Sequence, residues 1–284
     1  MNTKINLAGV ELKNPVMTAS GTFGSGMEYS EFVDLNKLGA VVTKGVANVP
    51  WPGNPTPRIA ETYGGMINAI GLQNPGIDVF CERDIPFLKK YDTKIIVNVC
   101  GKSERDYVEV VERLAGEPVD MLEINISCPN VKEGGIAFGQ NAANIEHITK
   151  AIKNVAKQPV IMKLSPNVTD ITEMAKAAEA GGADVLSLIN TITGMKIDIN
   201  RQTFAVANKT GGLSGPAVKP VAVRMVYQVA NAVKIPIIGM GGIATAEDAL
   251  EFILAGATAV SIGTANFHNP RTTLEVIEGI EKYM

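Results

Sequence analysis

The 284-residue chain has little of what marks the nucleic-acid-binding and disulfide-rich classes of protein. Aromatic residues make up only 5%, too few for a platform that stacks single-stranded nucleic acid. The net charge of -3 leaves no basic footprint for a duplex. Cys81, Cys100 and Cys128 form no CxxC pair, so we expect no disulfide framework, no metal site and a reducing compartment.

Long hydrophobic runs are missing as well. No apolar stretch reaches the ~18 residues that a membrane-spanning helix needs. Residues 1–15 lack the apolar segment of a secretory signal. We therefore expect a cytoplasmic protein that binds neither nucleic acid nor a membrane.

Eight short runs rich in Val, Ile, Leu and Met recur along the chain. Each is almost continuously apolar, which is typical of parallel strands that are buried on both faces. The predicted strands span residues 15–20, 40–46, 94–100, 121–127, 159–165, 184–190, 235–241 and 259–264.

Helical patterns separate these strands. They cover residues 103–114, 142–157, 170–180, 219–233, 246–255 and 270–282. Alternating strands and helices imply right-handed crossovers and a closed parallel sheet. The sequence thus predicts an α/β fold, a (β/α)8 TIM barrel that forms one domain over residues 1–284.

The spacing of the predicted strands also places extra segments. Ile5, Leu7, Val10 and Leu12 flank Ala8-Gly9, a pattern that predicts an N-terminal hairpin closing the barrel bottom. The intervals after strands two and six are too long for one helix, and the interval after strand four is slightly long. Loops at the carboxyl ends of barrel strands build the active site, so we interpret these insertions as lids.

Polar residues gather where the predicted strands end. Lys44 lies near the end of strand two, and Lys163 lies in strand five. A lysine in an apolar strand costs several kcal/mol unless it meets an anion or loses its charge. Two such lysines in one barrel mouth favour a bound anion or an electron-rich cofactor over two edge residues.

The last two strands end in glycine-rich turns, Gly239–Gly242 and Gly263-Thr264. Loops after strands seven and eight of such barrels commonly bind phosphate through backbone N–H groups. A phosphate here, together with Lys163, predicts flavin mononucleotide (FMN) across the barrel mouth.

The segment NISCPNVKEGG, residues 125–135, carries the most specific signal. Cys128 leaves a strand into a Pro/Asn/Gly loop, whereas we interpret Cys81 and Cys100 as buried thiols. His147 and His268 are distant in sequence, which disfavours a Cys–His nucleophile pair and leaves a thiolate general base or a redox thiol. Amide side chains that suit a small, planar, amide-rich ligand are those of Asn68, Asn125, Asn130 and Asn190.

The chain resembles the dihydroorotate dehydrogenase family along essentially its whole length. The motifs that carry this resemblance are TASGTFG, TKG, NAIGLQNPG, NISCPN and the GMGGI…SIGT pair. Cysteine in NISCPN resembles the class 1 enzymes, because the membrane-bound class has serine there. NVKEGG, TGMKIDI and GGLSGPAVKP resemble the class 1B branch. The resemblance implies oxidation of dihydroorotate to orotate in de novo pyrimidine synthesis.

The resemblance also implies a role for each matching position. Cys128 would be the base that removes a proton from C5 of dihydroorotate, while hydride leaves C6 for FMN. The FMN-binding residues would be Ser20, Lys44, Gly45, Asn98, Asn125, Lys163, Ile189, Gly215, Gly241, Gly242, Gly263 and Thr264. The substrate-binding residues would be Lys44, Asn68, Ala69, Ile70, Gly71, Leu72, Asn125, Asn130, Asn190 and Thr191.

A partner subunit is implied too. In the class 1B branch a second chain with FAD and a 2Fe–2S cluster passes electrons to NAD, in a heterotetramer with two copies of each chain, and the FMN-binding chains form a homodimer. Three alternatives stay open: a fumarate-dependent class 1A enzyme, a dihydropyrimidine dehydrogenase-like barrel acting on uracil or thymine, and a non-catalytic flavin-binding scaffold. Dihydroorotate carries a carboxylate that uracil and thymine lack, so a cation beside the substrate distinguishes a dihydroorotate dehydrogenase from the second alternative. Lys44 is the candidate for this cation.

Overall fold

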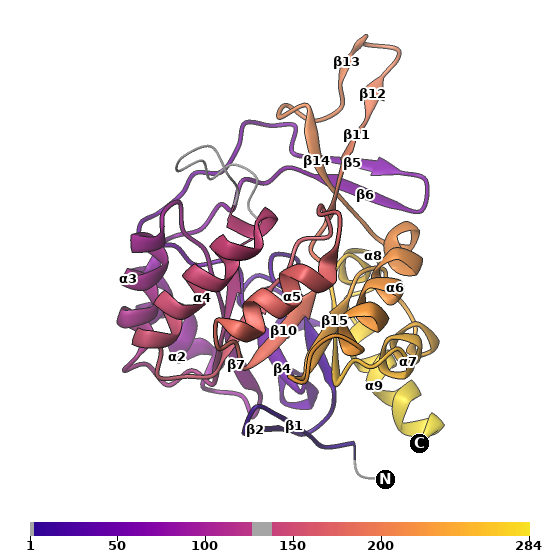
Figure 1. Cartoon of the computed structure of the whole chain (residues 1–284). Coiled ribbons are helices and arrows are strands. Elements are labelled where there is room, and N and C mark those ends of the chain that lie inside the picture. Colours follow the sequence, from indigo (N-terminus) through magenta and orange to yellow (C-terminus); the bar gives the residue numbers. More distant parts are fainter. Residues whose placement is uncertain (1–2, 127–137) are drawn as a thin grey trace.

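A closed barrel of eight parallel strands forms the centre of the protein (Figure 1). The computed structural model describes residues 3–126 and 138–284. The barrel strands are β3 (Val16–Thr18), β4 (Ala40–Val42), β7 (Lys94–Val99), β8 (Met121–Asn125), β9 (Val160–Lys163), β10 (Val185–Leu188), β15 (Ile237–Met240) and β16 (Ala259–Ile262). All eight predicted strands are confirmed, and each ends one to four residues earlier than its apolar run.

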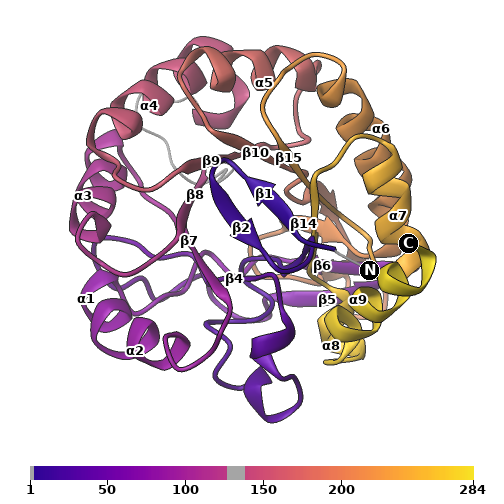
Figure 2. The ribbon, with the colours of Figure 1, turned by 90° about the horizontal axis from the view of Figure 1, so that it is seen from below.

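Six helices follow the predicted pattern and surround the barrel (Figure 2). They are α3 (Glu104–Leu114), α4 (Ala142–Val155), α5 (Ile171–Ala180), α6 (Lys219–Ala230), α7 (Ala246–Leu254) and α9 (Thr272–Tyr283). Side chains fix where several begin: Ser103 and Asp106 form a capping box on α3, and Asp170 caps α5. The (β/α)8 architecture is therefore confirmed.

Several short helices were not expected. Residues 77–88 form α1 (Ile77–Val79), a π-helical turn η3 (Phe80–Asp84) and α2 (Ile85–Leu88). The remaining short elements are α8 (Ala265–His268) and the 3-10 turns η1 (Tyr29–Glu31), η2 (Leu35–Lys37), η4 (Phe138–Gln140) and η5 (Pro216–Val218). The first group supplies the helix between β4 and β7 within the long insertion.

The N-terminal hairpin covers the bottom of the barrel, as predicted (Figure 2). Its strands β1 (Ile5–Leu7) and β2 (Val10–Leu12) pair antiparallel. Leu7 and Leu12 are fully buried and belong to one apolar cluster with side chains of the barrel strands. This end is therefore packed with hydrocarbon, and the opposite end is left for polar chemistry.

The long insertions form a second sheet above the barrel (Figure 1). Strands β5 (Ile59–Thr62) and β6 (Gly65–Asn68) come from the insertion after β4, while β11 (Ile192–Met195) and β14 (Thr210–Ser214) come from the one after β10. Their order is β11-β14-β6-β5, so two insertions distant in sequence share one sheet. The small hairpin of β12 (Ile197–Asp198) and β13 (Thr203–Phe204) extends beyond it. The insertion after β8 lies mostly outside the described residues.

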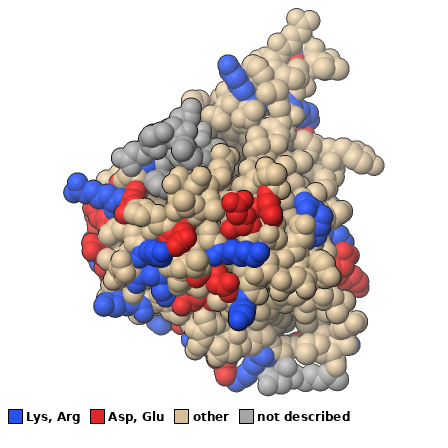
Figure 3. Space-filling model, viewed as in Figure 1, with Lys and Arg blue, Asp and Glu red and all other residues tan. Residues whose placement is uncertain are grey.

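The outer surface carries charges of both signs. On the face shown in Figure 3, Lys and Arg are interspersed with Asp and Glu over the helices. Pairs such as Lys153–Asp184, 2.6 Å apart, join neighbouring barrel units. Within residues 3–126 and 138–284, no helix combines the length and apolarity that crossing a bilayer requires.

Candidate active site

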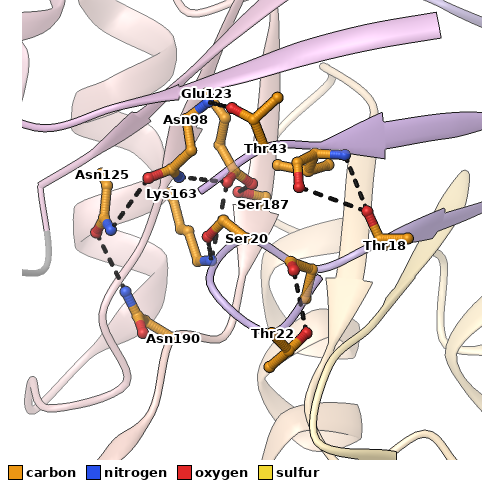
Figure 4. Close-up of polar contacts among 12 residues, drawn as sticks. Thr18, Ser20, Thr22, Thr43, Asn98, Glu123, Asn125, Lys163, Ser187 and Asn190 are labelled. Atoms are coloured by element: carbon orange, nitrogen blue, oxygen red, sulfur yellow. Dashed lines mark hydrogen bonds and ion pairs between the residues drawn. The ribbon is translucent and has the colours of Figure 1, made fainter. Parts of the chain in front are cut away.

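The carboxyl ends of the barrel strands bring charged and amide side chains together (Figure 4). Lys163 is the last residue of β9 and is only 4% exposed. Its Nζ donates to Ser20 Oγ at 3.0 Å and lies 3.8 Å from Glu123 Oε2. The predicted cation of strand five is thus buried inside the barrel mouth and joined to the loop after β3.

Glu123 is a site residue that the sequence reasoning missed. It lies on β8, is 1% exposed, and accepts hydrogen bonds from Asn98 Nδ2 at 2.6 Å and from Ser187 Oγ at 2.8 Å. The signal that could have found it is the one that identified Lys163, a charged residue inside an apolar strand.

Three of the predicted asparagines form one chain of hydrogen bonds (Figure 4). Asn125 Nδ2 donates to Asn98 Oδ1 at 3.5 Å, and Asn190 Nδ2 donates to Asn125 Oδ1 at 3.2 Å. The Thr191 backbone N–H then donates to Asn190 Oδ1 at 2.8 Å. Tyr107 donates to the Asn125 carbonyl at 2.7 Å, which anchors the end of β8. Amide groups from β7, β8 and the end of β10 therefore line one mouth.

Lys44 adds a second positive charge close by. It follows β4, is half-buried, and would lie 3.8 Å from a Cβ at Gly21. Burial lowers the pKa of Lys44, the charges of Lys163 and Arg58 lower it further, and Cys100 acts in the opposite direction. The two lysines therefore lie close enough to interact electrostatically, and such a pair of cations favours an anionic ligand.

The sheet β11-β14-β6-β5, which we call the lid sheet, carries the predicted residues of the NAIGL motif above the mouth. Asn68 ends β6 and donates from Nδ2 to the Gly212 carbonyl at 3.3 Å. A Cβ at Gly212 would meet Thr191 Oγ1 at 2.0 Å, so Gly212 lies directly against Thr191. Asn68 and Thr191, which are far apart in sequence, are in this way brought to the same place.

The turn that follows β6 holds its shape through backbone contacts. The Ala69 N–H donates to the Arg58 carbonyl at 2.7 Å, and the Asn54 N–H donates to the Ile70 carbonyl at 3.0 Å. Gly71 has φ 75°, and a Cβ there would lie 2.7 Å from Asn54. The next residue, Leu72, packs beside Ala47, Trp51 and Cys100. Glycine is therefore required where the motif turns.

Glycines from three loops meet at the other side of the mouth. Gly215, Gly241 and Gly242 all have positive φ, and a Cβ at Gly242 would lie 2.8 Å from the Gly215 carbonyl oxygen. Thr264 Oγ1 donates to Ser214 Oγ at 2.8 Å, which brings the Gly263-Thr264 turn to the same place. Backbone without side chains beside a hydroxyl is the surface that a phosphate group fits.

The structure places two further predicted residues, Gly45 and Ile189, and does not describe two others. Gly45 lies against Asn98, because a Cβ there would be 3.1 Å from Asn98 Oδ1. Ile189 is buried, and its N–H donates to the Met240 carbonyl at 3.0 Å. Cys128 and Asn130 lie outside the described residues, so their assigned roles stay predictions.

Comparison with known proteins gives the family. The family model described as dihydroorotate dehydrogenase matches residues 2–284. A relative from Lachnoclostridium phytofermentans, described as the catalytic subunit of dihydroorotate dehydrogenase B (NAD(+)), is 78% identical over 100% of this chain and 95% of its own. A relative of the same description from Alkaliphilus metalliredigens is 69% identical over 100% of this chain and 94% of its own.

A solved structure agrees. The DHODH of Eimeria tenella, crystallised in complex with ferulenol, superposes with a TM-score of 0.82 at 25% identity, covering 99% of this chain and 84% of that one. The fold, the polar barrel mouth and the full-length matches lead to one conclusion: the chain belongs to the dihydroorotate dehydrogenase family.

Proposed function

We propose that this chain oxidises dihydroorotate to orotate in de novo pyrimidine synthesis, as the catalytic subunit of an NAD-linked enzyme. The observation that carries the proposal is the barrel mouth, where Lys44 and Lys163 lie beside the chain of asparagine amides. Two cations and several amides suit a ligand that carries both a carboxylate and ring amides, as dihydroorotate does.

The cofactor in this proposal is one FMN per chain. The glycines of three loops offer a phosphate surface at one side of the mouth, and Lys163 offers a positive charge at the other. When bound, FMN supplies the acceptor for the hydride that leaves dihydroorotate. Lys163 then stabilises the negative charge that reduction adds. The binding set is Ser20, Lys44, Gly45, Asn98, Asn125, Lys163, Ile189, Gly215, Gly241, Gly242, Gly263 and Thr264.

The substrate in this proposal lies between the mouth and the lid sheet. Asn125 ends barrel strand β8, Asn190 and Thr191 follow barrel strand β10, and Asn68 with residues 69–72 comes from the lid sheet. Asn130 completes the set as a prediction from sequence. Lys44 is the cation for the substrate carboxylate, a group that uracil and thymine lack, so this residue favours dihydroorotate over a dihydropyrimidine.

Cys128 is the proposed proton acceptor. The thiolate takes the proton from C5 of dihydroorotate, while the C6 hydride departs from the same molecule. Asn125 ends β8 three residues before Cys128 and belongs to the amide chain of the mouth. The strand therefore ends at the site, three residues before the thiol in the sequence.

The electrons leave through a second subunit in this proposal. The relatives described as catalytic subunits support such a partner. We propose that the partner holds FAD and a 2Fe–2S cluster, that two copies of each chain assemble with this chain as the central homodimer, and that the complex is cytoplasmic. The fumarate-dependent class 1A enzyme remains the alternative.

The cofactor proposal is tested by releasing the flavin from purified protein with acid and separating it by chromatography. We expect FMN, and we expect Lys163→Ala to retain less of it. Lys150→Ala is the matched control, because Lys150 is exposed on α4 and pairs with Glu146 at the surface. Recovery of FAD, or no flavin after reconstitution with FMN, contradicts the proposal.

A further inference from the structure

Glu123 is a buried carboxylate to which the reaction above gives no role. Both of its oxygens accept hydrogen bonds, Oε2 from Asn98 and Oε1 from Ser187, and Oε2 also faces the Lys163 ammonium at 3.8 Å. At 1% exposure it cannot touch a ligand through solvent-accessible surface. A buried charge is retained only with partners, so its position behind Lys163 and Asn98 points to a function through them.

The carboxylate also determines which way the amides point. An ionised carboxylate only accepts hydrogen bonds, so Asn98 must turn its Nδ2 toward Glu123 and its Oδ1 away. Asn98 Oδ1 then receives Asn125 Nδ2, and Asn125 Oδ1 receives Asn190 Nδ2. Every donor in the chain thus points toward Glu123 (Figure 4). The carboxylate thereby fixes the donor and acceptor pattern that the mouth offers to its ligands.

We propose that Glu123 is a positioning residue that holds the Lys163 ammonium and the Asn98 amide in the orientation used by the flavin site. The proposal rests on the FMN site proposed above. Because Glu123 carries a negative charge 3.8 Å from the Lys163 ammonium, it also offsets part of the positive potential that the flavin ring meets. Reduction of the flavin adds negative charge, so this carboxylate makes reduction less favourable.

The first test uses the flavin-free full chain and compares Glu123→Gln, Lys163→Met and the double variant. Glutamine keeps the shape of the side chain and can donate to Ser187, so the substitution removes mainly the charge. Each single variant leaves one buried charge without its partner. We expect each single variant to melt at a lower temperature than the wild type. The decrease in melting temperature of the double variant should be smaller than the sum of the decreases in the two single variants. Additive losses overturn the proposal.

The second test measures the midpoint potential of the bound flavin. We expect Glu123→Gln to shift the potential in the positive direction relative to the wild type. Ser187→Ala is the matched control, because it removes one hydrogen bond to the same carboxylate and keeps the charge. Its potential should stay near that of the wild type. An unchanged potential in Glu123→Gln, or an equal shift in both variants, overturns the proposal.

The two tests separate this inference from the proposed function. If the wild-type chain binds no FMN, the proposed function fails, and the melting cycle still decides whether Glu123 positions Lys163. If FMN binds and the wild type oxidises dihydroorotate, additive melting losses or an unmoved potential overturn the role of Glu123 alone.

Discussion

Lys44 and Lys163 carry two positive charges into the barrel mouth, where burial makes each charge costly. Lys163 has Ser20 and Glu123 beside it, whereas the side chain of Lys44 makes no hydrogen bond or ion pair within residues 3–126 and 138–284. A negatively charged ligand would interact favourably with both lysines. The residues whose burial is costly therefore favour the binding of an anion.

The lowered pKa of Lys44 gives a prediction for the flavin-free chain. The folded state releases this proton at a lower pH than the unfolded state, whose lysine titrates near ~10.4. The folded chain thus gains stability from this group as pH rises through the lowered pKa. We expect Lys44→Met to raise the free energy of unfolding at neutral pH, because methionine carries no charge that burial would penalise. The difference should shrink as pH approaches the ordinary lysine range.

Urea denaturation of both proteins at several pH values measures this difference. Lys176→Met is the control, because Lys176 is exposed on α5. Its difference in free energy of unfolding from the wild type should not shrink with rising pH in the way expected for Lys44→Met. A stabilisation by Lys44→Met that grows with rising pH contradicts the assignment.

At the scale of elements, α7 and α9 pack closely because one helix lacks a side chain at the contact. Gly279 lies within α9, and a Cβ there would be 2.2 Å from the Ala246 Cβ of α7. Real Cβ atoms do not approach so closely, so the two helices would have to separate. Glycine in a helix normally destabilises it relative to alanine, and here packing outweighs that propensity.

Gly279→Ala should therefore destabilise the protein by about 1–3 kcal/mol, even though alanine is the better helix former. Gly116→Ala is the control, because nothing lies within 4 Å of a Cβ at that position. Its effect should stay within about 0.5 kcal/mol. Chemical denaturation measures both variants. A Gly279→Ala protein as stable as the wild type would show that α9 moves away from α7 without cost.

The barrel could be predicted from sequence because its strands and caps are local signals. β7 carries the consecutive apolar residues Ile95, Ile96 and Val97, and Ser103 with Asp106 marks the start of the next helix. The lid sheet could not be predicted in the same way. Asn68 pairs with Gly212, more than a hundred residues away, in strands that are half-exposed and short. Glu123 could have been singled out as a charged residue in an apolar strand, but its partners come from β7, β9 and β10, which only the closed barrel brings together.

At the scale of the whole molecule, the barrel separates a packed bottom from a polar mouth. The N-terminal hairpin fills the lower end with apolar side chains, and the lid sheet from two insertions lies above the other end (Figure 1). Substrate chemistry and electron exit must therefore use the lid side or the loops around it. The sequence carries no GxGxxG opening a βαβ unit, so we expect NAD to react on another chain.

The isolated chain should oxidise dihydroorotate with an artificial electron acceptor and react poorly with NAD. Adding the electron-transfer partner should restore NAD reduction without changing the rate of the dye-linked reaction. Steady-state assays with dye, with NAD, and with NAD plus partner measure the three cases. If the purified chain alone reduces NAD at about 10 s⁻¹, a typical turnover rate, the two-subunit account is wrong.

In the proposed reaction, dihydroorotate reduces a flavin in this barrel and Cys128 accepts the proton. Burial, with Glu117 adding to the effect, raises the pKa of Cys81 to about 11, which disfavours its thiolate. Cys81→Ala is therefore the control, because it removes a thiol that is not expected to act as a base. The most direct measurement is anaerobic stopped-flow reduction of the bound flavin by dihydroorotate. We predict that Cys128→Ala retains FMN and reduces it roughly 10² to 10⁴ times more slowly than the wild type. Cys81→Ala should match the wild type. Flavin reduction in Cys128→Ala at the wild-type rate, or none in the wild type, would contradict the account.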